Sequence, residues 1–236
     1  MFEFSSRVRY SEIGFDYHMK LSAIAGRMQD CSVFHSESIG FGPDMWEQEK
    51  AGWIILSWQI LVHEYPAFGE PVITRTWPHS FRGFEGDRNF TLRDESGKIF
   101  AEANSRWIYF DVEAQKPRRV PEWMKEGFST EPRLGHFEYS PRRLPVPDGE
   151  PAVYPSFAVV PTNIDTNHHV NNLQYIDMGA GYLPEGFWTR ELRVEYVRQS
   201  VLGDILTPRV WEMEEGVFVC LENEAGKTSA NLQFLR

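Results

Sequence analysis

The sequence has few cysteines and no cysteine-rich motif. Only Cys31 and Cys220 occur among 236 residues, and they do not stand in a CxxC spacing. One possible pair cannot build a disulfide scaffold, and a cysteine zinc site needs more thiol ligands at closer spacing. We therefore expect two buried thiols and no metal site.

Long apolar runs and an apolar leader are also missing. The opening residues 1–7 lack a basic start followed by an apolar stretch, and no run approaches the roughly 20 apolar residues that span a bilayer. The sequence contains no GxGxxG, Walker loop or GxSxG elbow. These absences predict a cytoplasmic protein that spans no membrane and needs no cofactor.

Basic residues are outnumbered by acidic ones. The formal charge of -10 argues against general nucleic-acid binding, because phosphate contacts need a basic surface. An acidic macromolecular partner would need a local basic patch. Residues 116–119 and the pair Arg142 and Arg143 are two candidates, and solvated charge in a connector is the alternative.

What the sequence does contain is an internal repeat. Residues 92–98 resemble residues 221–227, and both read as polar turns between strand-like runs. Two further pairs agree in spacing, since 203 − 69 and 211 − 77 both give 134 for Gly69 with Gly203 and Trp77 with Trp211. We also align Asp16 with Asp165, at an offset of 149, which puts extra residues in the first copy.

Each copy is predicted to place one helix before a run of antiparallel strands, which indicates an α+β fold. The helix of the first copy, at 18–35, has an apolar face that includes Met28 and Cys31. The elements expected are strands at 53–64, 70–77, 87–95 and 98–111, then a short strand at 154–160, a helix at 168–181 and strands at 189–200, 204–213, 216–223 and 227–235.

A proline-rich segment separates the two copies. Residues 117–151 hold seven of the fifteen prolines, which interrupt regular sheet and continuous helix. We therefore place an N-terminal domain at 1–125, a connector at 126–150 and a C-terminal domain at 151–236.

The most informative polar cluster lies at the start of the second predicted helix, where Asp165, Asn167 and His169 occur together. Unpaired N–H groups at a helix N-terminus can polarise a carbonyl, which suits acyl transfer, and they favour a neutral imidazole. The alternative is that Asp165 or Asn167 only caps the helix. A metal site at His168 and His169 is disfavoured because consecutive helical residues point about 100° apart.

At these residues the sequence resembles the plant and bacterial acyl-acyl carrier protein thioesterases, which are tandem hotdog domains. The pattern D-x-N-x-H-V-N-N-x-x-Y runs from Asp165 to Tyr175, and residues 53–60 and 105–108 look like strands of that family's first domain. The resemblance implies a double hotdog, each domain a long helix wrapped by an antiparallel sheet.

The resemblance also implies roles for single residues. Asp165, Asn167 and His169 would form the catalytic site that hydrolyses a fatty acyl-acyl carrier protein to free fatty acid and carrier thiol. The first copy would shape the acyl pocket, with Met28 and Cys31 as candidate wall residues. The expected partner is an acyl carrier protein carrying a fatty acyl chain.

One family position departs from the pattern. The family's strand after the catalytic helix has a glutamate after Tyr-x-Arg, often followed by cysteine, whereas Gln199 and Ser200 stand here. Glutamine can position a water but cannot take a proton as a carboxylate does. Our hypothesis is water attack with His169 or Asp165 as base and Gln199 orienting the water. Ser200 as nucleophile is a weaker alternative because it needs an adjacent base.

Other functions stay open at this stage. A hotdog protein with these residues can be an acyl-CoA thioesterase, a hydroxyacyl dehydratase or a non-catalytic module that binds acyl carrier protein. Monomer and homodimer are both compatible with the sequence. So is a preference for medium or for long acyl chains.

Overall fold

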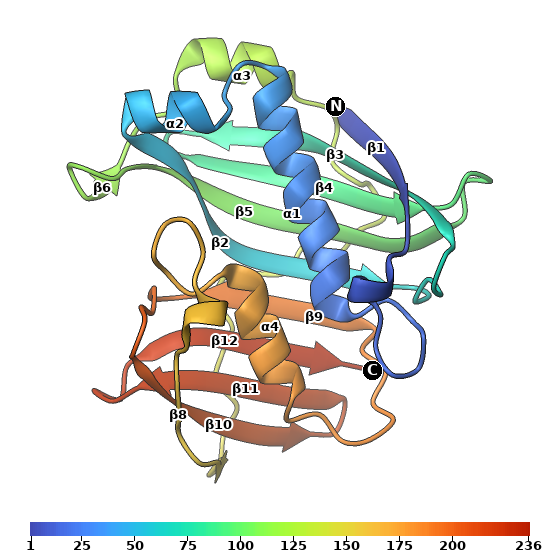
Figure 1. The fold of residues 1–236 in the computed structure, drawn as a ribbon, viewed down its shortest axis with the longest axis vertical. Coiled ribbons are helices and arrows are strands. Elements are labelled where there is room, and N and C mark those ends of the chain that lie inside the picture. Colours follow the sequence, from blue (N-terminus) through green and yellow to red (C-terminus); the bar gives the residue numbers. More distant parts are fainter. The chain divides into compact units, whose positions relative to one another are not determined.

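The chain divides into two compact units. The computed structural model describes residues 1–236, the side chain of Pro43 excepted. The first unit comprises Met1–Leu56 and Ile60–Ser140, and the second comprises Ser57–Gln59 and Pro141–Arg236. The division at residue 140 falls inside the proline-rich segment. Each unit has its own antiparallel strands and its own helix (Figure 1).

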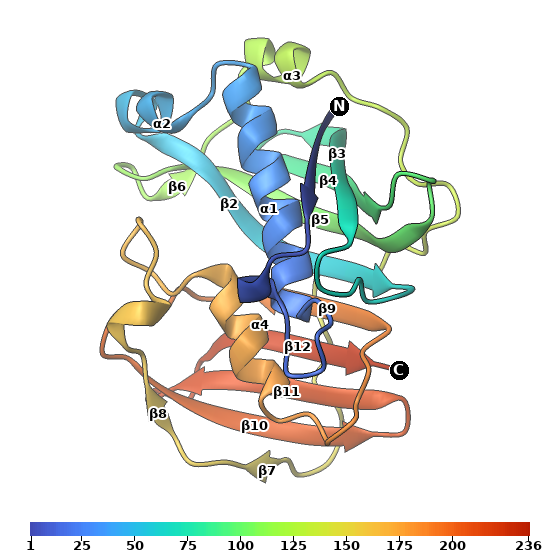
Figure 2. The same ribbon diagram turned by 45° about the vertical axis from the view of Figure 1, so that its right-hand side comes forward.

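The first unit packs one long helix on a sheet. Its strands occur in the order β1-β3-β4-β5-β2. The helix α1 begins three residues later than predicted and crosses one face of the sheet (Figures 1 and 2). The elements are β1 (Phe2–Arg7), α1 (Leu21–Ser38), α2 (Pro43–Glu49), β2 (Ala51–Val62), β3 (Pro71–Arg82), β4 (Glu85–Arg93), β5 (Ile99–Asp111), β6 (Lys116–Pro117) and α3 (Glu122–Phe128). The sequence analysis missed β1, α2 and α3.

The predicted apolar face of α1 is buried. Ile24, Ala25, Met28 and Cys31 recur at helical spacing and none of them has any exposed surface. Burying such a stripe against a sheet is the main stabilisation of a helix that has no side-chain cap at Lys20.

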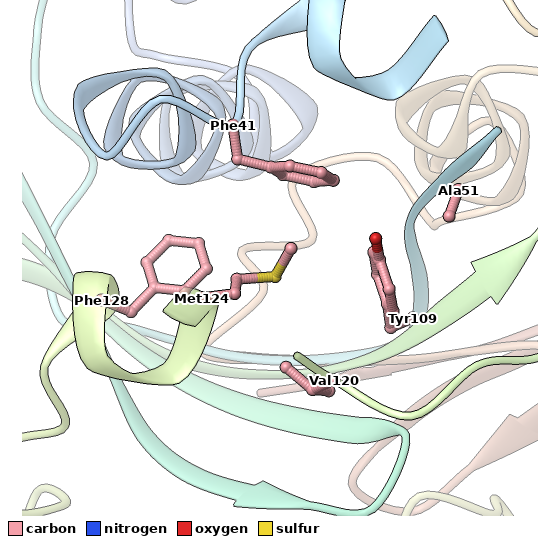
Figure 3. Packing of buried hydrophobic residues seen from close by; sticks show 6 residues of the cluster. All are labelled: Phe41, Ala51, Tyr109, Val120, Met124 and Phe128. Carbon is pink, nitrogen blue, oxygen red and sulfur yellow. The ribbon is translucent and has the colours of Figure 1, made fainter. Parts of the chain in front are cut away.

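A separate apolar cluster fills the end of the first unit near α2 and α3. Its buried members are Phe41, Ala51, Tyr109, Val120, Met124 and Phe128, which come from five segments of the unit (Figure 3). Phe41 packs against Tyr109 with ring centroids 6.0 Å apart. The cluster therefore ties α3, which precedes the proline-rich stretch, to β2 and β5.

The second unit repeats the arrangement in shorter form. Its strands follow the order β9-β12-β11-β10-β7, and β8 pairs with another part of β10. The elements are β7 (Ala152–Val153), β8 (Phe157–Ala158), α4 (Asn172–Ala180), β9 (Glu191–Tyr196), β10 (Ile205–Met213), β11 (Gly216–Asn223) and β12 (Thr228–Leu235). The predicted strand at 154–160 is wrong in extent, since only two of its residues are in a strand. The strand predicted at 189–200 is β9, which ends at Tyr196, four residues before the predicted end.

The structure corrects the alignment of the two helix entries. A short 3-10 turn precedes each helix, at Tyr10–Glu12 and Pro161–Asn163. Between each turn and its helix lies an antiparallel bridge, which joins Ile13 to Met19 in the first unit and Ile164 to Val170 in the second. The differences 161 − 10 and 164 − 13 both give 151, so the predicted offset of 149 is wrong. The earlier alignment matched two aspartates by identity, whereas the backbone hydrogen bonds match Gly14 with Asp165.

No helix among the described residues is both long and apolar enough to cross a membrane.

Candidate functional site

The residues from Asp165 to His169 form a tight loop before the helix. The N–H of Asp165 donates to the carbonyl of His169 at 2.8 Å, and the N–H of His168 donates to the carbonyl of Asp165 at 3.1 Å. His168 has a φ of 62°, in the left-handed region. A helix cannot contain this residue in that conformation, so the predicted helix start at residue 168 is wrong.

The helix begins instead at Asn172, because Asn171 caps it. The side-chain oxygen of Asn171 accepts the N–H of Leu173 at 2.9 Å. The interpretation of Asp165 or Asn167 as the cap is therefore wrong. The unpaired N–H groups of α4 also come after the polar cluster, so the cluster does not lie in the first turn, where the helix dipole acts most strongly.

Asp165 turns its carboxylate onto its own loop. Its Oδ1 accepts the N–H of Asn167 at 2.8 Å and approaches the N–H of His169 at 3.4 Å. The side chain is half-buried. A carboxylate that accepts backbone N–H groups in this way holds the backbone of the loop in place. It thereby fixes the backbone position from which the His169 side chain projects.

His169 has an unsatisfied ring nitrogen. The residue is half-buried, and its Nδ1 atom is buried without a hydrogen-bond partner among the residues the structure describes. Buried polar atoms usually have a partner, so this nitrogen is left available for a hydrogen bond to a water or a ligand. Asn167, two residues earlier, is exposed. The loop thus presents an imidazole and an amide on one short stretch of chain.

A second loop, after β9, is tied to this one. The N–H of Val170 donates to the carbonyl of Ser200 at 2.9 Å, and the N–H of Ser200 donates to the hydroxyl of Tyr175 at 3.1 Å. Gln199, directly before Ser200, is exposed. Burial raises the pKa of Tyr175, which favours its neutral hydroxyl. The residue after Gln199 is therefore hydrogen-bonded to the residue after His169.

Ser200 is a poor nucleophile in this setting. Its side chain is buried, and its hydroxyl donates to the hydroxyl of Ser229 at 3.0 Å. A serine needs a base at the hydroxyl to become nucleophilic, and another serine is not one. Sequence reasoning did not point to Ser229, which lies in an ordinary strand pattern.

The structure also reveals a hydrogen bond from the hydroxyl of Tyr196 to the carbonyl of Asn172 at 2.9 Å. Burial raises the pKa of Tyr196 strongly. This contact joins the end of β9 to the first residue of α4. Tyr196 stands in the Tyr-x-Arg pattern, so the signal was present in the sequence, although no role was assigned to it.

The first unit has the same loop with different chemistry. His18 occupies the position of His169, and Asp16 that of Asn167, since 18 and 169 differ by the same 151. The Nδ1–H of His18 donates to the carbonyl of Asp16 at 2.9 Å, and its backbone N–H donates to the Asp16 carboxylate at 3.0 Å. The first copy therefore has an imidazole at this position, contrary to the predicted alignment, but it lacks the amide and has Gly14 at the Asp165 position.

Met28 and Cys31 lie inside the first unit. Both are fully buried, and the Cys31 thiol donates to the carbonyl of Thr74 at 3.5 Å. Burial raises the pKa of Cys31 to about 12, so the thiol is un-ionised and chemically inert at neutral pH. Their position between α1 and the sheet suits an apolar wall.

The sequence and the fold are similar to those of known proteins. Residues 1–128 match the family model of the acyl-ACP thioesterase N-terminal domain. The oleoyl-acyl carrier protein thioesterase 1 of Arabidopsis thaliana is 27% identical over 218 residues, which cover 84% of this chain and 60% of that protein. A palmitoyl-acyl carrier protein thioesterase of Cuphea hookeriana is 27% identical over 227 residues, covering 84% and 52%. The chain thus spans little more than half the length of these relatives.

Two solved structures have the same fold. An acyl-ACP thioesterase from Bacteroides thetaiotaomicron superimposes with a TM-score of 0.88 at 20% identity, covering 99% of this chain and 96% of that one. The 12:0-ACP thioesterase from Umbellularia californica gives 0.85 at 18% identity, with coverage of 99% and 96%. The predicted α+β double hotdog is therefore confirmed.

Proposed function

The chain belongs to the acyl-ACP thioesterase family, and on that premise we propose that it hydrolyses fatty acyl thioesters of acyl carrier protein to free fatty acid and carrier thiol. One observation supports the proposal above the others. The Nδ1 atom of His169 is buried without a partner, in a loop that also contains an amide and a carboxylate. An imidazole with a free nitrogen is the general base that this reaction needs near neutral pH.

The proposed catalytic residues are Asp165, Asn167, His169 and Gln199. His169 takes the proton of the attacking water. Asn167 donates its amide N–H to the thioester oxygen, where negative charge develops. Gln199 orients the water, and Asp165 positions the loop through its hydrogen bonds to backbone N–H groups.

The reaction proceeds by addition and elimination. The water oxygen bonds to the thioester carbonyl carbon while its proton passes to His169, and the carbonyl oxygen becomes an oxyanion. The oxyanion then re-forms the double bond, the carbon–sulfur bond breaks, and the imidazolium returns its proton to the leaving thiolate. No redox change and no further reactant are required.

We assign the acyl pocket to the first unit and the chemistry to the second. Met28 and Cys31 are buried apolar side chains on the face of α1 that packs on the sheet, and we assign them to the wall of the acyl pocket. In this assignment 1–125 is the acyl-pocket domain, 126–150 the connector and 151–236 the catalytic domain. Cytoplasmic location and the oligomeric state, monomer or homodimer, stay predictions.

The test is thiol release from carrier-linked thioesters of medium and long acyl chains, with matching coenzyme A thioesters alongside. We expect the wild type to release thiol and His169→Ala to lower kcat by about 10²-fold or more. The matched control is His18→Ala, which removes the imidazole at the same loop position of the first unit and should leave kcat within about twofold.

Two results would contradict the proposal. If His169→Ala and His18→Ala were equally active, His169 would not be the base. If the wild type bound acyl carrier protein without releasing thiol, the protein would be a binding module, and the glutamine at position 199 would be the first residue to examine. Enoyl absorbance without thiol would indicate a dehydratase.

A further inference from the structure

Each of the two units contains an equivalent corner, where a strand leaves the sheet beside a polar turn. In the first unit the N–H groups of His63 and Glu64 both donate to the carbonyl of Phe100, at 2.8 and 3.1 Å. In the second unit the N–H groups of Val197 and Arg198 both donate to the carbonyl of Ser229, at 2.9 and 3.1 Å. The corner therefore places Arg198 where the first unit has Glu64.

The neighbouring turn matches in the same way. The N–H of Lys98 donates to the side chain of Asp94 at 2.9 Å, and that of Lys227 to the side chain of Asn223 at 3.0 Å. Because 100 − 98 and 229 − 227 are equal, both lysines stand two residues before the shared carbonyl. Lys227 is thus the counterpart of Lys98.

The two corners differ in charge at one of these two positions. In the first unit Lys98 and Glu64 form an ion pair at 2.6 Å, and this hydrogen bond raises the pKa of Lys98. In the second unit the same two positions hold Lys227 and Arg198. Both side chains are exposed, and no ion pair involves either of them within the described part of the chain.

The second corner also has fewer carboxylates than the first. Asn223 stands where the first unit has Asp94. Around Lys98 the first corner holds four carboxylates, those of Glu64, Glu70, Asp94 and Glu95. The matching positions around Lys227 hold two carboxylates, an amide and a second cation: Asp204, Glu224, Asn223 and Arg198. Arg198 and Lys227 occupy the positions of a pair that is in contact in the first unit. Like charges at such positions repel each other, and an external anion relieves that repulsion.

The cationic corner adjoins the candidate site. Gln199 follows Arg198 directly, and the carbonyl of Ser200 binds the N–H of the residue after His169. Val201 and Leu202 come next and are 43% and 57% exposed. An arginine beside exposed apolar side chains is typical of a protein-binding surface.

We propose that Arg198, Lys227, Val201 and Leu202 form the docking surface for an acidic acyl carrier protein. The proposal rests on the function proposed above and names the part of the chain that receives the partner. A chain of net charge -10 repels an acidic protein except at a local basic patch. Among the basic residues suggested by sequence, Arg118 is paired with Glu49 at 2.9 Å, whereas Arg198 stands directly before Gln199 of the candidate site.

The test is the double variant Arg198→Glu/Lys227→Glu, assayed with one acyl chain on three carriers: acyl carrier protein, coenzyme A and pantetheine. We expect the ratio of kcat/KM for the carrier-protein thioester to that for the pantetheine thioester to fall about tenfold, mainly through KM. In the wild type, KM for the carrier-protein thioester should rise with ionic strength, and this dependence should weaken in the variant. Lys98→Glu, at the matching turn of the first unit, is the control and should leave the ratio within about twofold.

Each outcome separates this inference from the function itself. Thiol release by the wild type supports the function whatever the variant does. An unchanged ratio in the double variant overturns the docking surface. An equal loss with acyl carrier protein and coenzyme A, relative to pantetheine, also overturns it, because the cations would then bind the phosphate that both carriers share. An unchanged midpoint of urea denaturation in the double variant, relative to the wild type, shows that the fold is intact.

Discussion

The N–H of Val170 donates to the carbonyl of Ser200 at 2.9 Å, which ties the loop ending in His169 to the loop containing Gln199. These loops are about 30 residues apart in sequence, yet one hydrogen bond joins them directly next to both candidate residues. The bond explains how a residue after β9 can act together with a residue before α4.

Restoring a carboxylate at position 199 should raise activity. The variant Gln199→Glu adds a group that can accept a proton, and we expect kcat on carrier-linked thioesters to rise about tenfold. Gln115→Glu, an exposed glutamine in a turn of the first unit, serves as the control for added negative charge. An unchanged or lower kcat in Gln199→Glu would mean that the amide acts as it stands.

Asp165 should be replaceable by asparagine but not by alanine. Its Oδ1 accepts the N–H of Asn167, a hydrogen bond that an asparagine oxygen can keep and alanine cannot. We expect Asp165→Asn to retain kcat within about threefold and Asp165→Ala to lose about tenfold, each measured as thiol release across pH. If the asparagine variant were as inactive as the alanine variant, the carboxylate itself would be the base.

Two tyrosines should respond oppositely to loss of their hydroxyl groups. The hydroxyl of Tyr109 is buried without a partner among the described residues, whereas that of Tyr175 accepts the N–H of Ser200 at 3.1 Å. We expect Tyr109→Phe to raise the free energy of unfolding by about 1 kcal/mol and Tyr175→Phe to lower it by about 1 kcal/mol. Urea denaturation measures both, and shifts of equal sign would contradict this account.

The fold was predictable because its signals are periodic. The apolar face of α1 and the long antiparallel strands follow from the spacing of apolar residues, and the repeated turns fixed which strands pair as hairpins. The short elements α2 and β1 were not predicted. Seven residues of α2 contain too little periodicity, and β1 is recognised only through its pairing with β3.

The site was predictable in composition but not in geometry. Asp165, Asn167 and His169 do lie in one loop, as their spacing in sequence requires. The helix start was misplaced because a string of polar residues fits a cap at several positions, and only the left-handed φ of His168 and the cap at Asn171 distinguish them. The charge difference between Glu64 and Arg198 emerged only once backbone hydrogen bonds aligned the two units.

The buried histidine of α1 should make the protein sensitive to acid. The Nη2–H of Arg88 donates to Nδ1 of His35 at 2.8 Å, and burial, followed by the charge of Arg88, lowers the pKa of His35 to about 3. In the unfolded chain this pKa is about 6.5. Between these values the unfolded state binds a proton that the folded state does not, so His35 destabilises the fold progressively as pH falls below about 6.5.

The variant His35→Gln tests this prediction, because glutamine keeps an acceptor for Arg88 but does not titrate. We expect the urea midpoint of the wild type to fall between pH 7 and pH 4, and that of the variant to fall less over the same range. The difference between the two curves isolates His35 from the carboxylates, which titrate in both proteins. Parallel curves would show that His35 is protonated as readily in the folded state as in the unfolded chain, and the buried contact with Arg88 would then not control its charge.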